Sequence, residues 1–275
     1  MFSFVFLEAA LFGIFGLIIG SFLNVLIYRQ GTGKGLGGRS RCMSCGKTLE
    51  WFDLIPVFSW IALRAKCRFC GSRVSIQYPL VEASTGIIFA FIGAAPTFGI
   101  SYKLLSCAIA ALLIAIAAYD IKHTIIPDPW VWTFNILAFL VSLIAGSWQL
   151  AALLAGPLAA LPLAALWYVS KGRWMGFGDA KLALGIGWLL GPFVGLASVM
   201  FAFVIGAAVS VCILIPLSYK DRIFRYLGIT RLSRAGGGLT MKSEVAFGPF
   251  LILSCIMFWL LALYGMPLPF GSFGM

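Results

Sequence analysis

Long apolar runs constrain the fold of this chain more than any other feature of its sequence. Seven such runs lie at Phe4–Tyr28, Leu80–Ala95, Leu104–Tyr119, Trp130–Ile144, Leu150–Tyr168, Ala180–Leu217 and Val245–Tyr264. A helix needs about 20 residues to cross the hydrocarbon layer of a membrane. Because only 11% of the residues are charged and 61% are hydrophobic, a water-soluble domain is excluded. The sequence predicts an all-α integral membrane protein.

The run Ala180–Leu217 is too long for one crossing at about 1.5 Å of rise per residue. We expect Gly191-Pro192 to divide it into a hairpin of two helices, because proline can begin a helix but interrupts its interior. The prediction is therefore about eight transmembrane helices. An even number of crossings places both termini on one side of the membrane, opposite the polar segment that follows the first run.

Positive charge is spread unevenly along the chain, whose net charge is +11. Nine of the 20 Lys and Arg lie in residues 29–73 and six lie in residues 220–242, whereas Lys103 is the one cation expected on the other side. In a soluble protein such a charge would suggest nucleic acid. In a membrane protein it indicates which segments are cytoplasmic, and it favours contact with anionic lipids. We therefore expect membrane lipids, and no nucleic acid, as partners.

The chain divides into a first transmembrane helix (1–29), a polar insert (30–79) and a membrane domain (80–275). Four cysteines of the insert form a C-x2-C-x21-C-x2-C pattern, namely Cys42, Cys45, Cys67 and Cys70. This spacing is close to that of four-thiolate zinc sites, and a cytoplasmic location argues against disulfides. With all four positions filled by protein ligands, the pattern predicts a structural zinc site in a small cytoplasmic insert.

Two acidic residues lie at the ends of apolar runs. Asp120 follows Leu104–Tyr119, and Asp179 precedes the long sixth run within Gly176-Phe177-Gly178-Asp179. The predicted topology brings both to the cytoplasmic side, where an acid at a membrane helix is a candidate functional group. Each alone would be read as a helix cap or a helix end among lipid headgroups. Two carboxylates in contact share one proton, so one can activate water while the other protonates a leaving amine. The pair therefore predicts peptide-bond hydrolysis.

The motifs around these acids resemble those of a known family. The stretch Gly176–Leu182 reads G-x-G-D-x-K-L, and Asp120–Asp128 reads D-x5-I-P-D. Further similar stretches are Gly20–Arg29, Asp53–Trp60, Tyr78–Glu82 and Glu244–Leu251. Together they resemble the type IV prepilin leader peptidases, which are membrane aspartyl proteases of the GxGD type. The resemblance implies that Asp120 and Asp179 are the catalytic pair and that Asp128 stabilises the intervening loop.

The same resemblance implies the substrates and a second activity. Members of the family remove the short basic leader of prepilins and pseudopilins at the cytoplasmic face of the bacterial inner membrane, for type IV pili or type II secretion. Members with the cysteine-bearing insert also methylate the new N-terminal amine, with S-adenosylmethionine as the methyl donor. Glu82, which follows the insert, is a candidate to bind either the amine or the donor. It is equally well placed to cap the start of a helix.

Two other functional classes share some of these features. In a proton-coupled membrane transporter the acids would relay protons, but both lie at helix ends on one side, and inverted repeats are not evident. A membrane-tethered zinc ribbon would bind a nucleic acid or a protein partner. Cleavage of a prepilin by the purified protein separates these classes. The sequence does not predict an oligomeric state.

Overall fold

The structure is a computed structural model that describes residues 2–33, 35, 37–96, 99–144, 150–214 and 246–266. The long helices of these ranges are α1 (Phe2–Arg29), α3 (Gln77–Ala94), α4 (Ile100–His123), α5 (Asp128–Ile144), α6 (Leu150–Ser170), α7 (Phe177–Leu190), α8 (Pro192–Val209) and α10 (Gly248–Leu263). Three short elements are η1 (Trp51–Leu54), α2 (Phe58–Ala62) and the π-helical turn η2 (Ser210–Leu214). Apart from two isolated β-bridges in the insert, regular structure in the described residues is helical, which confirms the predicted all-α class.

The predicted break of the sixth run lies where the sequence placed it. Helix α7 ends at Leu190, and α8 begins at Pro192. Between them Gly191 adopts φ 80° and ψ 173°, a conformation that a residue with a side chain rarely adopts. The hairpin of two helices is therefore confirmed. Its first helix has only 14 residues, or about 21 Å of length, and is shorter than the hydrocarbon layer.

Four helices in the described part of the chain are long and apolar enough to cross a membrane. They are α1 from Phe4, α4, α6, and the span Pro192–Cys212 that joins α8 to η2. Helices α5 and α10 are apolar but shorter. The outer faces of these helices are also apolar. Along α1, for example, Phe4, Phe6, Leu11 and Ile14 are exposed on the protein surface. A helix that is hydrophobic on its outer as well as its inner face is suited to lipid rather than water.

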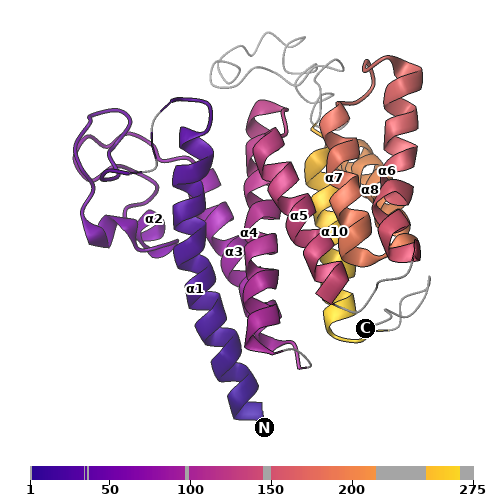
Figure 1. Cartoon of the computed structure of the whole chain (residues 1–275). Coiled ribbons are helices and arrows are strands. Elements are labelled where there is room, and N and C mark those ends of the chain that lie inside the picture. The colour runs from indigo at the N-terminus through magenta and orange to yellow at the C-terminus, as the bar shows by residue number, and fades with distance from the viewer. Residues whose placement is uncertain are drawn as a thin grey trace.

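The two acid-bearing helices occupy the middle of the helix assembly (Figure 1). Helix α4 contacts α1 and α3, which carry the insert, and it also contacts α5 and α10. Helix α7 contacts α5 and α10 as well, together with α6 and α8 on the far side from the insert. Helices α5 and α10 therefore bridge α4 and α7. The end of α4 and the start of α7 lie at the same end of the molecule as the insert (Figure 1).

Helices α1 and α3 meet along a seam of small residues. A Cβ atom added to Gly16 would lie 2.7 Å from the Thr85 carbonyl oxygen, and one added to Gly20 would lie 2.7 Å from the Glu82 Cα. Any side chain at either position would push the helices apart. Glycine at these positions therefore allows the close helix contact, which fixes the position of Glu82 against α1.

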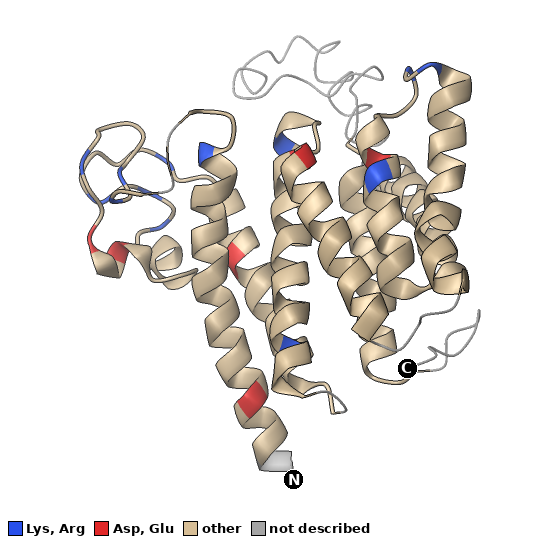
Figure 2. Ribbon diagram, in the orientation of Figure 1, with Lys and Arg blue, Asp and Glu red and all other residues tan. Residues whose placement is uncertain are grey.

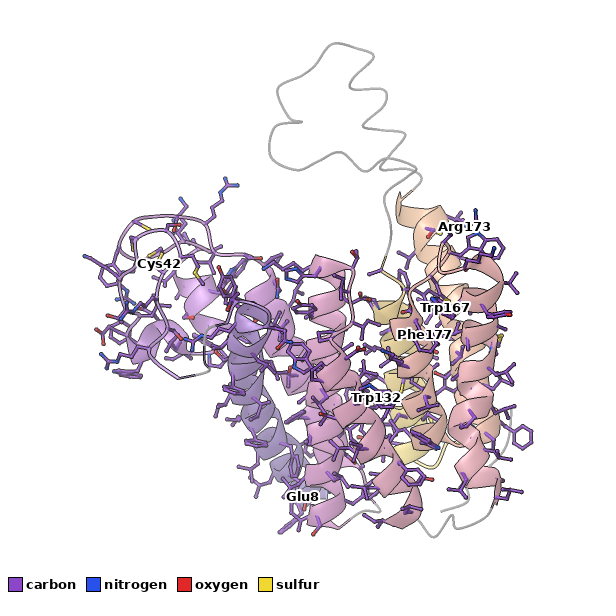
Figure 3. The ribbon with its side chains drawn as sticks, turned by 45° about the horizontal axis from the view of Figure 1, so that its top comes forward. Glu8, Cys42, Trp132, Trp167, Arg173 and Phe177 are labelled. Atoms are coloured by element: carbon purple, nitrogen blue, oxygen red, sulfur yellow. The ribbon has the colours of Figure 1, made fainter. Side chains whose placement is uncertain are left out.

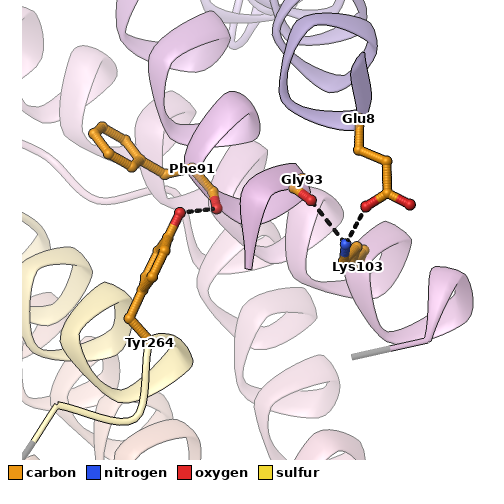
Figure 4. A network of polar contacts seen from close by, with 5 residues as sticks. All are labelled: Glu8, Phe91, Gly93, Lys103 and Tyr264. Carbon is orange, nitrogen blue, oxygen red and sulfur yellow. Dashed lines mark hydrogen bonds and ion pairs between the residues drawn. The ribbon is translucent and has the colours of Figure 1, made fainter. Parts of the chain in front are cut away.

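Charge separates the two ends of the molecule (Figure 2). Most Lys and Arg of the described residues lie in the insert or at helix ends on the same side, and one lies toward the opposite end of α4. That residue is Lys103, whose Nζ is 2.7 Å from Glu8 Oε2 and donates to the Gly93 carbonyl (Figure 4). Tyr264, which follows α10, donates its hydroxyl to the Phe91 carbonyl nearby. The basic segment 220–242 lies outside the described residues.

Candidate functional site

Asp120 lies in the last turn of α4 and is only 3% exposed. The helix ends three residues later, where Thr124 adopts a left-handed conformation and donates its N–H to the Asp120 carbonyl at 2.7 Å. The side chain points into the protein, although the residue belongs to a helix end. Asp120 is therefore a buried acid at the insert-side end of the helix assembly.

The N-terminus of α10 meets the Asp120 carboxylate. The Gly248 backbone N–H hydrogen bonds to this carboxylate, and a Cβ added to Gly248 would lie only 2.5 Å from Asp120 Oδ2. Only glycine allows so close an approach. The partial positive charge of a helix N-terminus also favours an anion at this place, which offsets the unfavourable position at the C-terminus of α4.

Asp179 lies in the first turn of α7 and is 7% exposed. Its backbone N–H donates to the Gly176 carbonyl, as the first turn of a helix allows. Gly178, next to Asp179, and Gly248, next to the Asp120 carboxylate, both pack on Ile126, so the structure places the two acids at one helix junction. Each lies at a helix N-terminus: Asp179 at that of its own helix and Asp120 at that of α10.

Ile126, in the loop after α4, packs against the starts of both α7 and α10. Its side chain packs against Gly178, where an added Cβ would lie 3.1 Å from the Ile126 Cβ. The Cδ1 atom of the same residue would lie 3.3 Å from a Cβ added to Gly248. One isoleucine in the loop after α4 is thus wedged between the start of α7 and the start of α10. Glycine on both sides is what lets these elements converge on Asp120.

Asp128 makes a second connection between the same segments. Its Oδ1 atom lies 2.7 Å from the Lys181 Nζ, which joins the start of α5 to the first turn of α7. Two turns further into α5, the Asn135 amide donates to the Lys181 carbonyl at 3.1 Å. These contacts agree with the predicted loop-stabilising role of Asp128.

Aromatic side chains cover the outer side of α7 near Asp179. Phe177 packs on Trp167 of α6 with ring centroids 4.9 Å apart, and Lys181 Nζ lies 5.5 Å from the Phe177 centroid. Figure 3 shows these two rings next to each other, with Arg173 beyond them in the connecting loop. His123 lies on the surface, where its ring stacks on the ring of Tyr119.

The four cysteines of the insert form one cluster. Their Sγ atoms all lie within 4.8 Å of one another, and Cys42 and Cys70 are 3.8 Å apart. Four thiolates around zinc at about 2.3 Å in tetrahedral geometry would be separated by about 3.8 Å. The cluster therefore fits the zinc ion that the cysteine spacing predicts.

Each pair of cysteines sits on a similar turn. The Gly46 N–H donates to the Cys42 carbonyl and the Gly71 N–H donates to the Cys67 carbonyl, both at 2.9 Å. Hydrogen bonds from the backbone N–H groups of Cys45 and Ser44 lower the pKa of the Cys42 thiol to about 6. The Lys47 N–H favours the Cys45 thiolate, but desolvation and the neighbouring thiols raise the Cys45 pKa to about 11. A cation at the centre would favour the thiolate form of all four.

Glu82 lies in the second turn of α3, so it does not cap the start of that helix. It is buried, and its Oε2 atom accepts the backbone N–H of Val57 from the insert at 2.7 Å. The Ser21 hydroxyl of α1 hydrogen bonds to the same carboxylate. Glu82 also lines a cavity of about 530 Å³ between the insert and helices α1 and α3. It therefore belongs to a polar site separate from the two aspartates.

Sequence reasoning gave no role to two residues of these sites. Gly248 belongs to the stretch Glu244–Leu251 and Val57 to the stretch Asp53–Trp60, both of which carry the resemblance. A glycine just before a proline at the start of an apolar run was the available signal for Gly248. Nothing in the local sequence indicates that Val57 reaches Glu82.

Two family models match separate parts of this chain. A model of the bacterial peptidase A24 N-terminal domain matches residues 14–95, and the model of the type IV leader peptidase family matches residues 107–211. Among similar proteins are three named prepilin leader peptidase/N-methyltransferase. The protein of Myxococcus xanthus is 35% identical over 209 residues, which cover 74% of this chain and 62% of that one.

The protein of Bacillus subtilis is also 35% identical, over 204 residues that cover 70% of this chain and 78% of that one. The protein of Vibrio cholerae is 32% identical over 233 residues, which cover 75% of this chain and 90% of that one. No solved structure gives a significant match. On these similarities, this chain belongs to the type IV leader peptidase family.

Proposed function

We propose that this chain is a membrane-embedded aspartic endopeptidase that removes the leader of prepilins or pseudopilins, and that it also methylates the N-terminus it creates. The observation that carries the proposal is the position of two buried carboxylates, Asp120 and Asp179, on separate helices at one junction of a membrane protein. The curated relatives at 35% identity bear the name of both activities.

The two carboxylates supply the chemistry of hydrolysis. With one proton between them, the ionised carboxylate takes a proton from a water molecule, which attacks the carbonyl carbon of the scissile bond. The protonated carboxyl then delivers its proton to the departing amine nitrogen. The pair ends the cycle with one proton again. The Gly248 N–H and the N-terminus of α7 keep negative charge tolerable at these buried positions.

The same geometry favours a substrate that is itself a membrane helix. Both acids lie at one end of the helix assembly, so a substrate helix that lies along the enzyme within the bilayer would present its polar N-terminal junction at their level. Phe177 and Gly178, beside Asp179, are our candidates for a shallow pocket that accepts the glycine before the cut. Such substrates would serve pili or secretion.

We propose about eight crossings in the bacterial inner membrane, with an orientation set by charge. The insert, the end of α4 that carries Lys122, the loop that carries Arg173 and the start of α7 lie at one end (Figure 2), which we assign to the cytoplasm. Lys103 lies at the other end and is paired with Glu8. Anionic lipids would meet the basic end.

The insert would hold a structural zinc ion and serve the methyl transfer. Cys42, Cys45, Cys67 and Cys70 would bind the ion and fix the fold of the insert. S-adenosylmethionine is the proposed methyl donor and is consumed as a substrate. We place Glu82 at its binding site. The matched models and relatives give no support to a proton-coupled transporter.

Incubation of the purified chain with a prepilin tests the function directly. Mass spectrometry is expected to show loss of the leader, followed, when S-adenosylmethionine is added, by a gain of one methyl group on the new N-terminus. An intact prepilin after incubation with wild-type protein in lipid would contradict the peptidase assignment. A cleaved but unmethylated product would contradict only the second activity.

A further inference from the structure

The cavity beside the insert has the size of a binding site for a small molecule. Its volume is about 530 Å³, and its walls come from α1, from the start of α3 and from both cysteine turns of the insert. Sites for ligands of nucleoside size fall in this range of volume. Two of the proposed zinc ligands, Cys42 and Cys67, line it, so folding of the insert around zinc would shape one wall.

Two carboxylates, those of Asp53 and Glu82, line this cavity, and among the described residues only Asp53 is paired with a cation. Asp53 is neutralised by Arg68, whose guanidinium donates to Asp53 Oδ1 at 2.8 and 3.0 Å. Glu82 receives only neutral donors, the Val57 N–H and the Ser21 hydroxyl, and has no ion-pair partner within the described ranges. A buried carboxylate with no cation beside it is costly unless something positive binds there.

A strained turn holds Glu82 in place. Val57 adopts φ 62° and ψ −47°, and the Phe58 N–H donates to the Pro56 carbonyl at 2.6 Å, which closes a γ-turn with positive φ. This conformation is rare for a β-branched residue. It aims the Val57 N–H at Glu82 Oε2. Such strain is found where a site needs a fixed geometry, and here it fixes one oxygen of the Glu82 carboxylate.

The wall that faces Glu82 from the insert is basic and partly aromatic. Arg41, Lys66 and Arg73 line the cavity and form no ion pair in the part of the chain that the structure describes. Trp60 and Tyr78 add aromatic surface. The cavity is therefore lined by a carboxylate of α3, by cations of the insert and by aromatic rings.

We propose that this cavity binds S-adenosylmethionine, with Glu82 against the positive charge of the donor and the insert cations near its carboxylate. The proposal rests on the methyltransferase activity proposed above and deepens it by naming the site. S-adenosylmethionine carries a sulfonium, an ammonium, a carboxylate and a purine, and each finds a complementary group on the walls. Val57 is a positioning residue for Glu82.

Lys122, in the last turn of α4, also lines the cavity, and its Nζ lies 5.2 Å from the Tyr28 ring centroid. In the transfer the neutral amine forms a C–N bond to the methyl carbon, and the C–S bond breaks with its electron pair going to sulfur. The amine then loses one proton to water.

Direct binding measurements test this assignment without any prepilin. The full-length zinc-loaded chain in lipid nanodiscs is titrated calorimetrically with S-adenosylmethionine. The substitution Glu82→Gln keeps the shape and the acceptor for Val57 but removes the charge, and it is expected to weaken binding about tenfold or more. The control Glu50→Gln removes an exposed carboxylate of the same insert that lies outside the cavity lining, and its affinity should stay within about twofold of wild type.

Unchanged affinity in a folded Glu82→Gln protein would overturn the assignment. If that variant does not fold, ultraviolet cross-linking of labelled S-adenosylmethionine to the wild-type chain decides. Label in residues 21–29, 40–49 or 72–82 supports the cavity, and label in residues 177–190 overturns it. A wild-type chain that binds the donor at the cavity but leaves prepilin intact would contradict the proposed peptidase function and not this site.

Discussion

The cysteine cluster and the aspartate site are built in opposite ways. In the insert, each pair of ligands lies on one short turn closed by local backbone hydrogen bonds, such as Gly46 N–H to the Cys42 carbonyl. At the aspartate site the carboxylates come from α4 and α7, a third helix supplies Gly248, and Ile126 is packed between them. A metal can assemble the first site, whereas the second requires the packed helices.

Because of this difference, a change that disrupts one site should leave the other site intact. Loss of zinc should disturb the insert and the donor cavity that it walls, and leave the helices around Asp120 in place. A change at the helix junction should stop peptide hydrolysis and leave the metal bound.

The largest effect is expected at the acids. Substitution of Asp120 or Asp179 by Asn removes the shared proton and should lower the rate of leader cleavage by about 10³-fold or more. Zinc content and S-adenosylmethionine affinity should stay at wild-type values. Cleavage is followed by mass spectrometry of the product and zinc by elemental analysis. Cleavage within tenfold of wild type for either variant would remove that residue from the catalytic pair.

The second-largest effect is expected from the loss of one zinc-binding thiolate. Replacing Cys45 or Cys70 by Ser is expected to lower zinc content well below one ion per chain and to make the insert sensitive to protease, because the site loses one of four ligands. The matched control is Cys212→Ser, which changes an exposed cysteine outside the cluster. Full zinc content in Cys45→Ser would contradict the four-thiolate site.

The glycine contact at Asp120 is expected to matter nearly as much. The added methyl group of Gly248→Ala would collide with Asp120 Oδ2, so the carboxylate must move, and we expect cleavage to fall about 10²-fold. Gly99→Ala is the control, since a Cβ there meets no atom within 4 Å. Equal rates for the two variants would show that the α10 contact is unimportant for cleavage.

The ion pair between Asp128 and Lys181 should have the smallest effect. The Asp128 side chain is 61% exposed, and exposed pairs contribute about 1 kcal/mol or less. Asp128→Asn is therefore expected to lower cleavage by about fivefold at most, with a similar loss for Lys181→Met. If Asp128→Asn were as inactive as Asp120→Asn, Asp128 would have a place in the chemistry and not only in the loop.

The sequence predicted the parts of this molecule that depend on neighbours along the chain. Apolar runs predicted the helices, Gly191-Pro192 predicted their division, and cysteine spacing predicted the cluster. The topology also placed Asp120 and Asp179 at one end. It could not show that Gly248 touches Asp120 or that Val57 touches Glu82, because those contacts depend on how distant segments pack. The position of Glu82 inside a helix, rather than at its start, was missed because the helix begins at Gln77, three residues before the apolar run.

A double-mutant comparison tests the central claim that the two aspartates act as one unit. Leader cleavage is measured for Asp120→Asn, for Asp179→Asn and for the chain that carries both substitutions. If the carboxylates share one proton and one reaction, the double variant should be about as slow as either single variant. Losses that multiply, or substantial cleavage after either single change, would contradict a coupled pair.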